Sequence, residues 1–356
     1  MIPRSCGAKV LRATVLLALM RGATLANAQT LDQQVKAAAT APVTWVGYRA
    51  PMVSGPREMC CYDSFSDGAF ANGGSCRLET GGGVSMNTGD SLNQRGSRVA
   101  LESPTEFSVL ARMEGGRVTR IRTFTPDCAL DAGGLPLVWL KDVRPDDSVA
   151  WLTALVLGSA DTGEQHDRVG KTAVSAIALH NAPSADRALE SFAAPSRPEW
   201  LRSDVAFWLG STRGEAGARL LQRMIAQDPS DKVRDKVTFG LSVSKQPSAL
   251  TALIATARDD RSTKVRGQAL FWLAQKAGRE AIATISGAIE NDPETEVKKK
   301  AVFALSQLPK DEGVPKLIEV ARTNRNPEVR KQAIFWLGQS KDPRATRFFE
   351  EILLKK

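Results

Sequence analysis

Residues 328–338 read Glu-Val-Arg-Lys-Gln-Ala-Ile-Phe-Trp-Leu-Gly, and related phrases recur upstream at a constant interval of 32 residues. The valine of this phrase aligns with an apolar residue in every copy, at Val169, Leu201, Val233, Val265, Val297 and Val329. A fixed period of roughly 20 to 50 residues is typical of solenoids, in which each unit buries its apolar side against its neighbours. The sequence therefore predicts an all-α solenoid.

Each 32-residue unit is predicted to form two helices joined by a turn. A segment such as Asn326-Pro327 or Asp292-Pro293 precedes the recurring phrase, and such residues end one helix and begin the next. The repeats are predicted to fill residues 145–356, with helix pairs at 147–180, 183–211, 213–243, 247–276, 279–308 and 312–340 and a capping helix at 343–354.

The turn and the phrase together follow the pattern V-R-x-x-A-x-x-x-L-G after D/N-P, as in residues 326–338. This pattern resembles the short bacterial type of HEAT repeat, an armadillo-like helical repeat that is also found in phycobilisome-lyase-like proteins. The resemblance covers residues 147–354 and implies an interaction scaffold. It also implies that the basic residue after the valine bridges acidic or carbonyl groups of neighbouring turns, at Arg202, Arg234, Arg266, Lys298 and Arg330.

An enzymatic alternative follows from the same resemblance, because HEAT-like proteins include phycobilin lyases and iron-dependent deoxyhypusine hydroxylases. The hydroxylases imply several His-Glu ligand pairs. This chain has two histidines, His166 and His180, and neither lies in such a pair. We interpret His166 as a solvated loop residue and His180 as a helix cap. We therefore predict no catalytic residue, no metal and no cofactor.

The first 28 residues are predicted to be an export signal. A basic start is followed by the apolar run 13–20 and by Ala26-Asn27-Ala28, a small-x-small cleavage site. Arg21 ends the run well short of the about 20 apolar residues that a membrane span needs. We expect a periplasmic or secreted protein without a transmembrane segment after cleavage. Residues 29–41 are interpreted as a leader segment.

Residues 42–140 are predicted to form a small β-rich domain that resembles no family we can name. Residues 107–112 and 117–124 alternate in side-chain type around a turn that contains Gly115 and Gly116, which indicates a hairpin. Residues 44–48 and 99–101 complete a predicted antiparallel sheet of four strands.

Four cysteines lie in this domain, Cys60, Cys61, Cys76 and Cys128. An even number of cysteines in an exported chain favours two disulfides. A bond between the adjacent Cys60 and Cys61 would strain the backbone, so 60–76 with 61–128 and 60–128 with 61–76 both remain open. A four-thiolate zinc site is the alternative, and the spacing disfavours it because two C-x2-C pairs are absent.

Charge is distributed unevenly along the chain. Residues 29–200 carry 16 basic and 20 acidic side chains, whereas residues 201–356 carry 28 basic and 19 acidic ones. A basic array can attract nucleic acid or an anionic surface. Export makes nucleic acid an improbable partner, so we expect a solvated basic face, with contact to an anionic envelope surface as the alternative.

The recurring phrase can be divided into faces by advancing 100° per residue from its valine. The valine and the residues four, seven and eight positions later share one side, which is predicted to face the core. The residue at the seventh position alternates between tryptophan and a small residue, as Trp208, Gly240, Trp272, Ala304 and Trp336. Because dense interiors pair large with small side chains, we interpret these tryptophans as core.

The residue six positions after the valine points almost opposite the core and is phenylalanine in five copies, Phe207, Phe239, Phe271, Phe303 and Phe335. Polar residues share this face, among them Lys236, Gln268, Lys300 and Gln332. Rungs about 10 Å apart would match three residues of an extended peptide. We predict a protein or peptide partner on the concave face, with no catalysis. The alternative is that the rings are packed between adjacent repeats.

Overall fold

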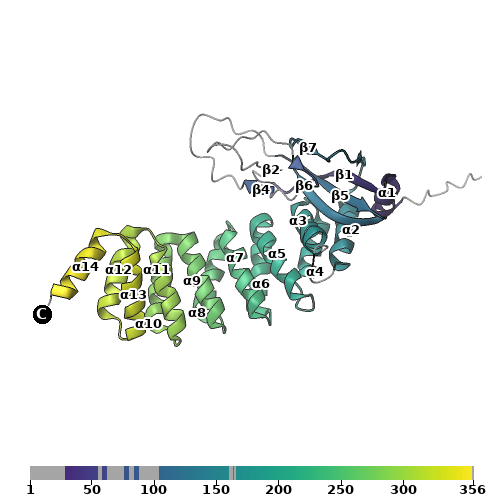
Figure 1. Cartoon of the computed structure of the whole chain (residues 1–356). Coiled ribbons are helices and arrows are strands. Elements are labelled where there is room, and N and C mark those ends of the chain that lie inside the picture. Colours follow the sequence, from purple (N-terminus) through teal and green to yellow (C-terminus); the bar gives the residue numbers. More distant parts are fainter. Residues whose placement is uncertain are drawn as a thin grey trace, which may run out of the picture.

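The computed structural model describes residues 29–54, 58–61, 76–79, 84–87, 104–159, 163 and 166–354. The predicted signal at 1–28 and the predicted strand at 99–101 lie outside these residues. In the described part a small β-rich region comes first, and a row of helices coloured from teal to yellow leads from it to the C-terminus (Figure 1). The chain is therefore an α-solenoid preceded by a small β region.

Helix α1 (Leu31–Ala38) forms within the predicted leader segment. The Thr30 hydroxyl accepts a hydrogen bond from the backbone N–H of Gln33, and the Gln33 side chain accepts one from the backbone N–H of Thr30. This reciprocal capping satisfies two donors at the start of the helix. Leu31 and Val35 are buried in the main core, so the leader is part of the folded domain.

The main sheet has the strand order β6–β5–β1–β8. The four strands are β1 (Val43–Pro51), β5 (Glu106–Glu114), β6 (Arg117–Phe124) and β8 (Leu137–Trp139). The predicted hairpin is confirmed, because β5 and β6 pair antiparallel around Gly115 and Gly116, whose φ angles are 55° and 73°. The prediction of a wholly antiparallel sheet is wrong, because β8, the fourth strand of this sheet, pairs parallel with β1. A strand of three residues is too short to show an alternating pattern.

Two short ladders accompany this sheet. Strand β2 (Glu58–Cys61) pairs with β4 (Val84–Asn87), and β3 (Cys76–Arg77) pairs with β7 (Leu130–Asp131). Cys76 is buried in a small cluster around Trp45, and Cys128 packs against the same cluster. The Cys128 sulfur lies 2.9 Å from the carbonyl oxygen of Met59. The side chains of Cys60 and Cys61 lie outside the described part of the structure, so the two disulfides and their pairing stay a prediction.

The solenoid begins with α2 (Pro145–Leu157), the π-helical turn η1 (His166–Gly170) and α3 (Lys171–Leu179). The first helices of the following pairs are α4 (Pro183–Phe192), α6 (Gly214–Gln227), α8 (Pro247–Asp259), α10 (Ile282–Asn291, after the 3-10 turn η2 Gly278–Ala281) and α12 (Lys310–Thr323). The second helices, which carry the recurring phrase, are α5 (Glu199–Thr212), α7 (Asp231–Val243), α9 (Thr263–Ala277), α11 (Thr295–Ser306) and α13 (Pro327–Gln339). Helix α14 (Pro343–Leu354) follows them.

The spacing of the helices differs between the two sides of the row. A Cβ atom at Gly210 in α5 would lie 2.0 Å from the carbonyl oxygen of Gly240 in α7, so these two backbones touch directly. The first helices α6 and α8 instead leave an open cavity of about 720 Å³ between them. Close spacing on one side and wide spacing on the other make the row curve toward the second helices.

A buried chain of hydrogen bonds joins the sheet to the solenoid. The Tyr48 hydroxyl lies 2.7 Å from Ser148 Oγ, which lies 2.8 Å from His180 Nε2, while His180 Nδ1 lies 2.7 Å from the Ala176 carbonyl oxygen. Because the carbonyl only accepts, Nδ1 carries the proton and Nε2 accepts from Ser148. Burial lowers the pKa of His180 to about 4, against the opposing hydrogen bond to Ala176.

One prediction about the histidines is confirmed and the other is wrong. His180 is the C-cap residue of α3, as predicted, and is also fully buried at this junction. His166 is buried, with its ring edge-on to Trp200 at a centroid distance of 4.3 Å, instead of being solvated. In each case the residue that covers the histidine is distant in the sequence. None of the described helices combines the length and the apolar composition that a membrane span requires.

Candidate functional site

Buried arginine–aspartate pairs hold the second helices in register. Arg202 pairs with Asp228, Arg234 with Asp260 and Arg266 with Asp292, at shortest distances of 2.7, 2.9 and 2.8 Å between guanidinium nitrogen and carboxylate oxygen. All six side chains are buried. We call this series the arginine ladder.

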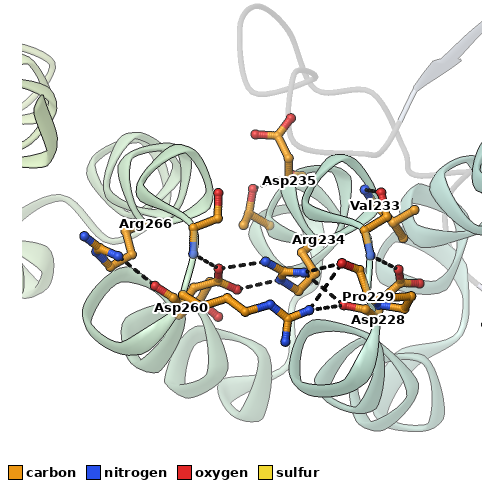
Figure 2. A network of polar contacts seen from close by, with 12 residues as sticks. Asp228, Pro229, Val233, Arg234, Asp235, Asp260 and Arg266 are labelled. Carbon is orange, nitrogen blue, oxygen red and sulfur yellow. Dashed lines mark hydrogen bonds and ion pairs between the residues drawn. The ribbon is translucent and has the colours of Figure 1, made fainter.

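Each arginine of the ladder joins two turns of the solenoid. Figure 2 shows Arg234 between Asp228 of the preceding turn and Asp260 of the following turn. It donates to the carbonyl oxygen of Asp228 at 2.9 Å and to both carboxylate oxygens of Asp260 at 2.9 and 3.2 Å. The flat fork of the guanidinium suits this two-sided bonding. The predicted bridging role is therefore confirmed for these arginines.

The ladder changes chemistry toward the C-terminus. Lys298 takes the place of arginine and Asn324 the place of aspartate, and Lys298 Nζ donates to the carbonyl oxygen of Glu290 at 2.7 Å. Arg330 donates to the carbonyl oxygens of Asn324 and Arg325 at 2.8 and 3.1 Å. Both side chains bridge to carbonyl groups, as predicted. Within the part of the chain that the structure describes, neither forms a carboxylate pair of the kind seen in the three preceding units.

Eight aromatic rings form a continuous row on the second helices, and we call this row the aromatic stripe. In order of contact its members are Trp208, Phe207, Phe239, Trp272, Phe271, Phe303, Trp336 and Phe335. Ring centroids of consecutive members lie between 4.7 Å and 5.9 Å apart. The stripe therefore crosses all five second helices, α5 to α13, without a gap.

The tryptophans connect phenylalanine pairs. Phe207 stacks on Phe239 at 5.6 Å, and Phe271 stacks on Phe303 at 5.9 Å. Trp272 lies between these two pairs, 4.7 Å from Phe239 and 4.8 Å from Phe271. The stripe thus repeats every two units, because only alternate units carry a tryptophan.

Two predictions about these aromatic residues need correction. The tryptophans pack against the main core but remain half-buried, so they belong to the stripe as well as to the core. The phenylalanines are not separate rungs, because their rings touch one another directly or through a tryptophan. Trp272 and Trp336 each reach the phenylalanine of the preceding unit, Phe239 and Phe303, which sequence spacing alone could not show.

The stripe is only partly accessible. Phe207, Phe239, Phe271 and Phe303 are half-buried, whereas Phe335 is 52% exposed. Phe239 has one face against Phe207 and the other toward Trp272, and Phe303 lies in the same way between Phe271 and Trp336. Neighbouring rings therefore occupy the faces of these phenylalanines, and ring edges are what remain available. The two predicted arrangements, exposed or packed between repeats, both hold in part.

The polar residues predicted beside the rings differ in exposure. Lys236 and Lys300 are exposed, and Gln268 and Gln332 are half-buried. The Lys300 stem lies across the neighbouring helix α9, because a Cβ atom at Gly267 would lie 2.1 Å from Lys300 Cδ. Lys236 and Lys300 form no ion pair among the described residues, so their charges are available to a partner.

Asp204 occupies the corresponding position in α5, at the N-terminal end of the stripe. Its Oδ2 atom is buried and has no hydrogen-bond donor among the described residues. Burial raises the pKa of Asp204 to about 6, and the charge of Lys171 opposes this rise. The sequence shows an acid where other units have lysine or glutamine, but it does not show this burial.

The described residues contain no group of three or more His, Cys, Asp and Glu side chains that could hold a metal ion. The chemistry of the candidate site is that of a surface: apolar ring edges, two lysines and amide groups. Such a surface can bind an extended segment by contact and hydrogen bonding.

Comparisons with known proteins found a matching family and similar solved structures. A family described as HEAT repeats matches residues 250–325 and 285–356. Human deoxyhypusine hydroxylase in complex with glycerol is similar at 15% identity and a TM-score of 0.25, over 59% of this chain and 91% of that one. The complex of CpcE and CpcF of phycocyanin lyase from Nostoc sp. PCC7120 is similar at 19% identity and a TM-score of 0.32, over 61% and 85%.

No curated protein matches the chain. The two structural likenesses are too weak to carry an argument about function. The family match is independent of them and covers the three C-terminal copies of the recurring phrase, including the one at 328–338. Residues 250–356 of this chain are therefore HEAT repeats.

Proposed function

We propose that this protein is an exported HEAT-repeat scaffold that binds an extended segment of another protein along the aromatic stripe, without catalysis of its own. The observation that carries the proposal is the continuity of the stripe. Eight rings contact one another across five repeats while their edges remain accessible. The export signal predicted at 1–28 supports a periplasmic or secreted location.

The buried core does not account for the phenylalanines of the stripe. The residues that fill the interior of the second helices, such as Val265 and Leu273 in α9, are fully buried and complete the core without the phenylalanines. An apolar row left on a surface is costly unless a partner covers it. A row of five second helices at about 10 Å spacing spans about 40 Å, which is roughly 12 residues of extended chain. The stripe therefore suits a linear segment.

The test uses a phage-displayed library of random 12-residue peptides selected on the purified protein. Enriched peptides are synthesised with a fluorescent label, and their affinity is measured by anisotropy. Replacing Phe239, Phe271 and Phe303 together by Ser is expected to weaken binding at least tenfold. Because these half-buried rings also support the fold, Phe335→Ser serves as a second variant, since Phe335 is 52% exposed.

The control variant is Leu353→Ser, which removes an apolar side chain that is 80% exposed in α14, away from the stripe. It is expected to bind every peptide as well as the unmodified chain. The proposal is refuted when no peptide is enriched, or when binding survives the stripe substitutions in variants whose circular dichroism is unchanged.

A further inference from the structure

The polar groups beside the stripe that lack partners are mostly donors. The indole Nε1–H groups of Trp272 and Trp336 are buried and have no acceptor among the described residues. The exposed ammonium groups of Lys236 and Lys300 also have no carboxylate partner among the described residues. The indole groups are enclosed, whereas the ammonium groups are exposed, so an occupant rich in acceptors would complement the two lysines.

The ring geometry points in the same direction. An aromatic ring is negative on its faces and positive along its edge. In the pair Phe271–Phe303 the planes are within 3° of parallel and the centroids lie 5.9 Å apart, so the rings are offset and each covers part of the other's face. The edges that remain available attract carbonyl and carboxylate oxygens more than cations.

The charges on the second helices agree with this preference. Lys264 Nζ lies 3.6 Å from Asp235 Oδ2, and Lys299 Nζ lies 3.0 Å from Glu296 Oε1. The charges within each of these two pairs therefore offset each other. The side chains that share the stripe's side and form no ion pair among the described residues are Lys232, Lys236, Lys300, Lys331, Asp204 and Glu328. This side therefore carries four lysine side chains and two carboxyl groups. Burial raises the pKa of one of these carboxyl groups, that of Asp204.

We infer that the segment bound by the stripe is an extended acidic peptide that carries apolar residues as well as Asp or Glu. The inference rests on the proposed function. Successive side chains of an extended segment point to opposite sides, so every second residue faces the stripe. Among these residues, apolar groups contact the ring edges and carboxylates reach Lys236 and Lys300 beside them.

Single-stranded nucleic acid is the other polyanion that aromatic and basic residues commonly bind. It does so by stacking bases on ring faces. The faces of Phe239 and Phe303 are already covered by Phe207, Phe271 and the adjoining tryptophans. Phe335 is the exposed ring of the stripe and has an edge-on rather than a stacked neighbour. The stripe therefore offers no row of free platforms for successive bases, and a peptide is favoured.

The experiment uses the peptides selected above, each paired with a version in which every Asp and Glu is replaced by Asn or Gln. We expect an excess of Asp and Glu among selected sequences and about three- to tenfold weaker binding of the amide versions. Lys236→Gln combined with Lys300→Gln should weaken the acidic peptides by a similar factor. The same change should leave the amide versions unaffected. A 12-residue oligothymidylate should not compete.

The outcomes separate the two proposals. Peptides that depend on the stripe but bind equally well as amides, or that are basic, overturn this inference and leave the proposed function standing. Displacement by the oligothymidylate at a concentration like that of the peptides overturns it in favour of nucleic acid. A library without any peptide that depends on the stripe refutes the proposed function itself.

Discussion

Removal of one charge from the arginine ladder should destabilise the solenoid strongly. Asp260→Asn keeps a side-chain oxygen for the backbone N–H of Ser262, which donates to Asp260 Oδ1 at 2.7 Å. It removes the charge that faces Arg234, whose side chain is only 2% exposed. A buried charge that loses its partner costs about 3 to 5 kcal/mol. We expect a loss of this size in the free energy of unfolding.

The assay is equilibrium unfolding in urea together with hydrogen exchange of the backbone amides in α7 and α8. Asp342→Asn is the matched control, because Asp342 caps the start of α14 in the same way but pairs with the more exposed Arg344. Its effect should be confined to α14. The double variant Arg234→Met with Asp260→Asn should recover most of the loss, since no unpaired charge remains.

Two results would refute this reasoning. One is a loss below about 1 kcal/mol for Asp260→Asn, which would mean that the pair behaves like an exposed ion pair. The other is a double variant whose loss of unfolding free energy equals the sum of the losses in the two single variants. Such additivity would mean that the two side chains do not interact.

Two further predictions concern the junction and the close contact of second helices. The folded pKa of His180, about 4, lies below its ordinary value of 6.5, so the unfolded chain takes up a proton first as the pH falls. Between pH 7 and pH 4.5 the unfolding free energy should therefore fall by about 2 kcal/mol more in the unmodified chain than in His180→Gln; equal pH dependence would contradict this. Gly210→Ala should cost about 1 to 3 kcal/mol or more, because the added Cβ meets the backbone of α7. At the corresponding Gly338 no atom of another element lies within 4 Å of an added Cβ, so Gly338→Ala should be neutral or stabilising. Equal urea midpoints for the Gly210→Ala and Gly338→Ala variants would contradict the argument.

The sequence predicts most of the solenoid because its information is local and repeated. The 32-residue period places the helices, and the phrase positions assign core and surface to each residue. The resemblance to HEAT repeats implied the bridging role of Arg234, which a residue-by-residue reading would have assigned to a solvated basic face. In these respects neighbours along the chain, or one period away, determine the structure.

The rest depends on contacts that no period connects. His180 is buried because Ser148 lies 2.8 Å from its ring and Phe107 packs against it at 5.0 Å, and both residues are distant in the sequence. The fourth strand, β8, is too short to show a pattern. The position of Trp272 between Phe239 and Phe271 depends on how closely α7 approaches α9, which helix periodicity does not determine.

The ladder and the stripe are two aspects of one arrangement. The stripe is continuous only while successive second helices keep the offset that stacks Phe271 on Phe303, and buried charge pairs fix that offset as far as Asp292. Beyond that residue, Lys298 donates to the backbone carbonyl oxygen of Glu290 and the Asn324 amide donates to the Glu290 carboxylate, in place of a buried charge pair. The same end of the stripe carries its most exposed ring, Phe335. A peptide that spans α11 and α13 would therefore add contacts where the protein's own ladder is weakest, so binding should protect the amides of these helices more than those of α5 and α7.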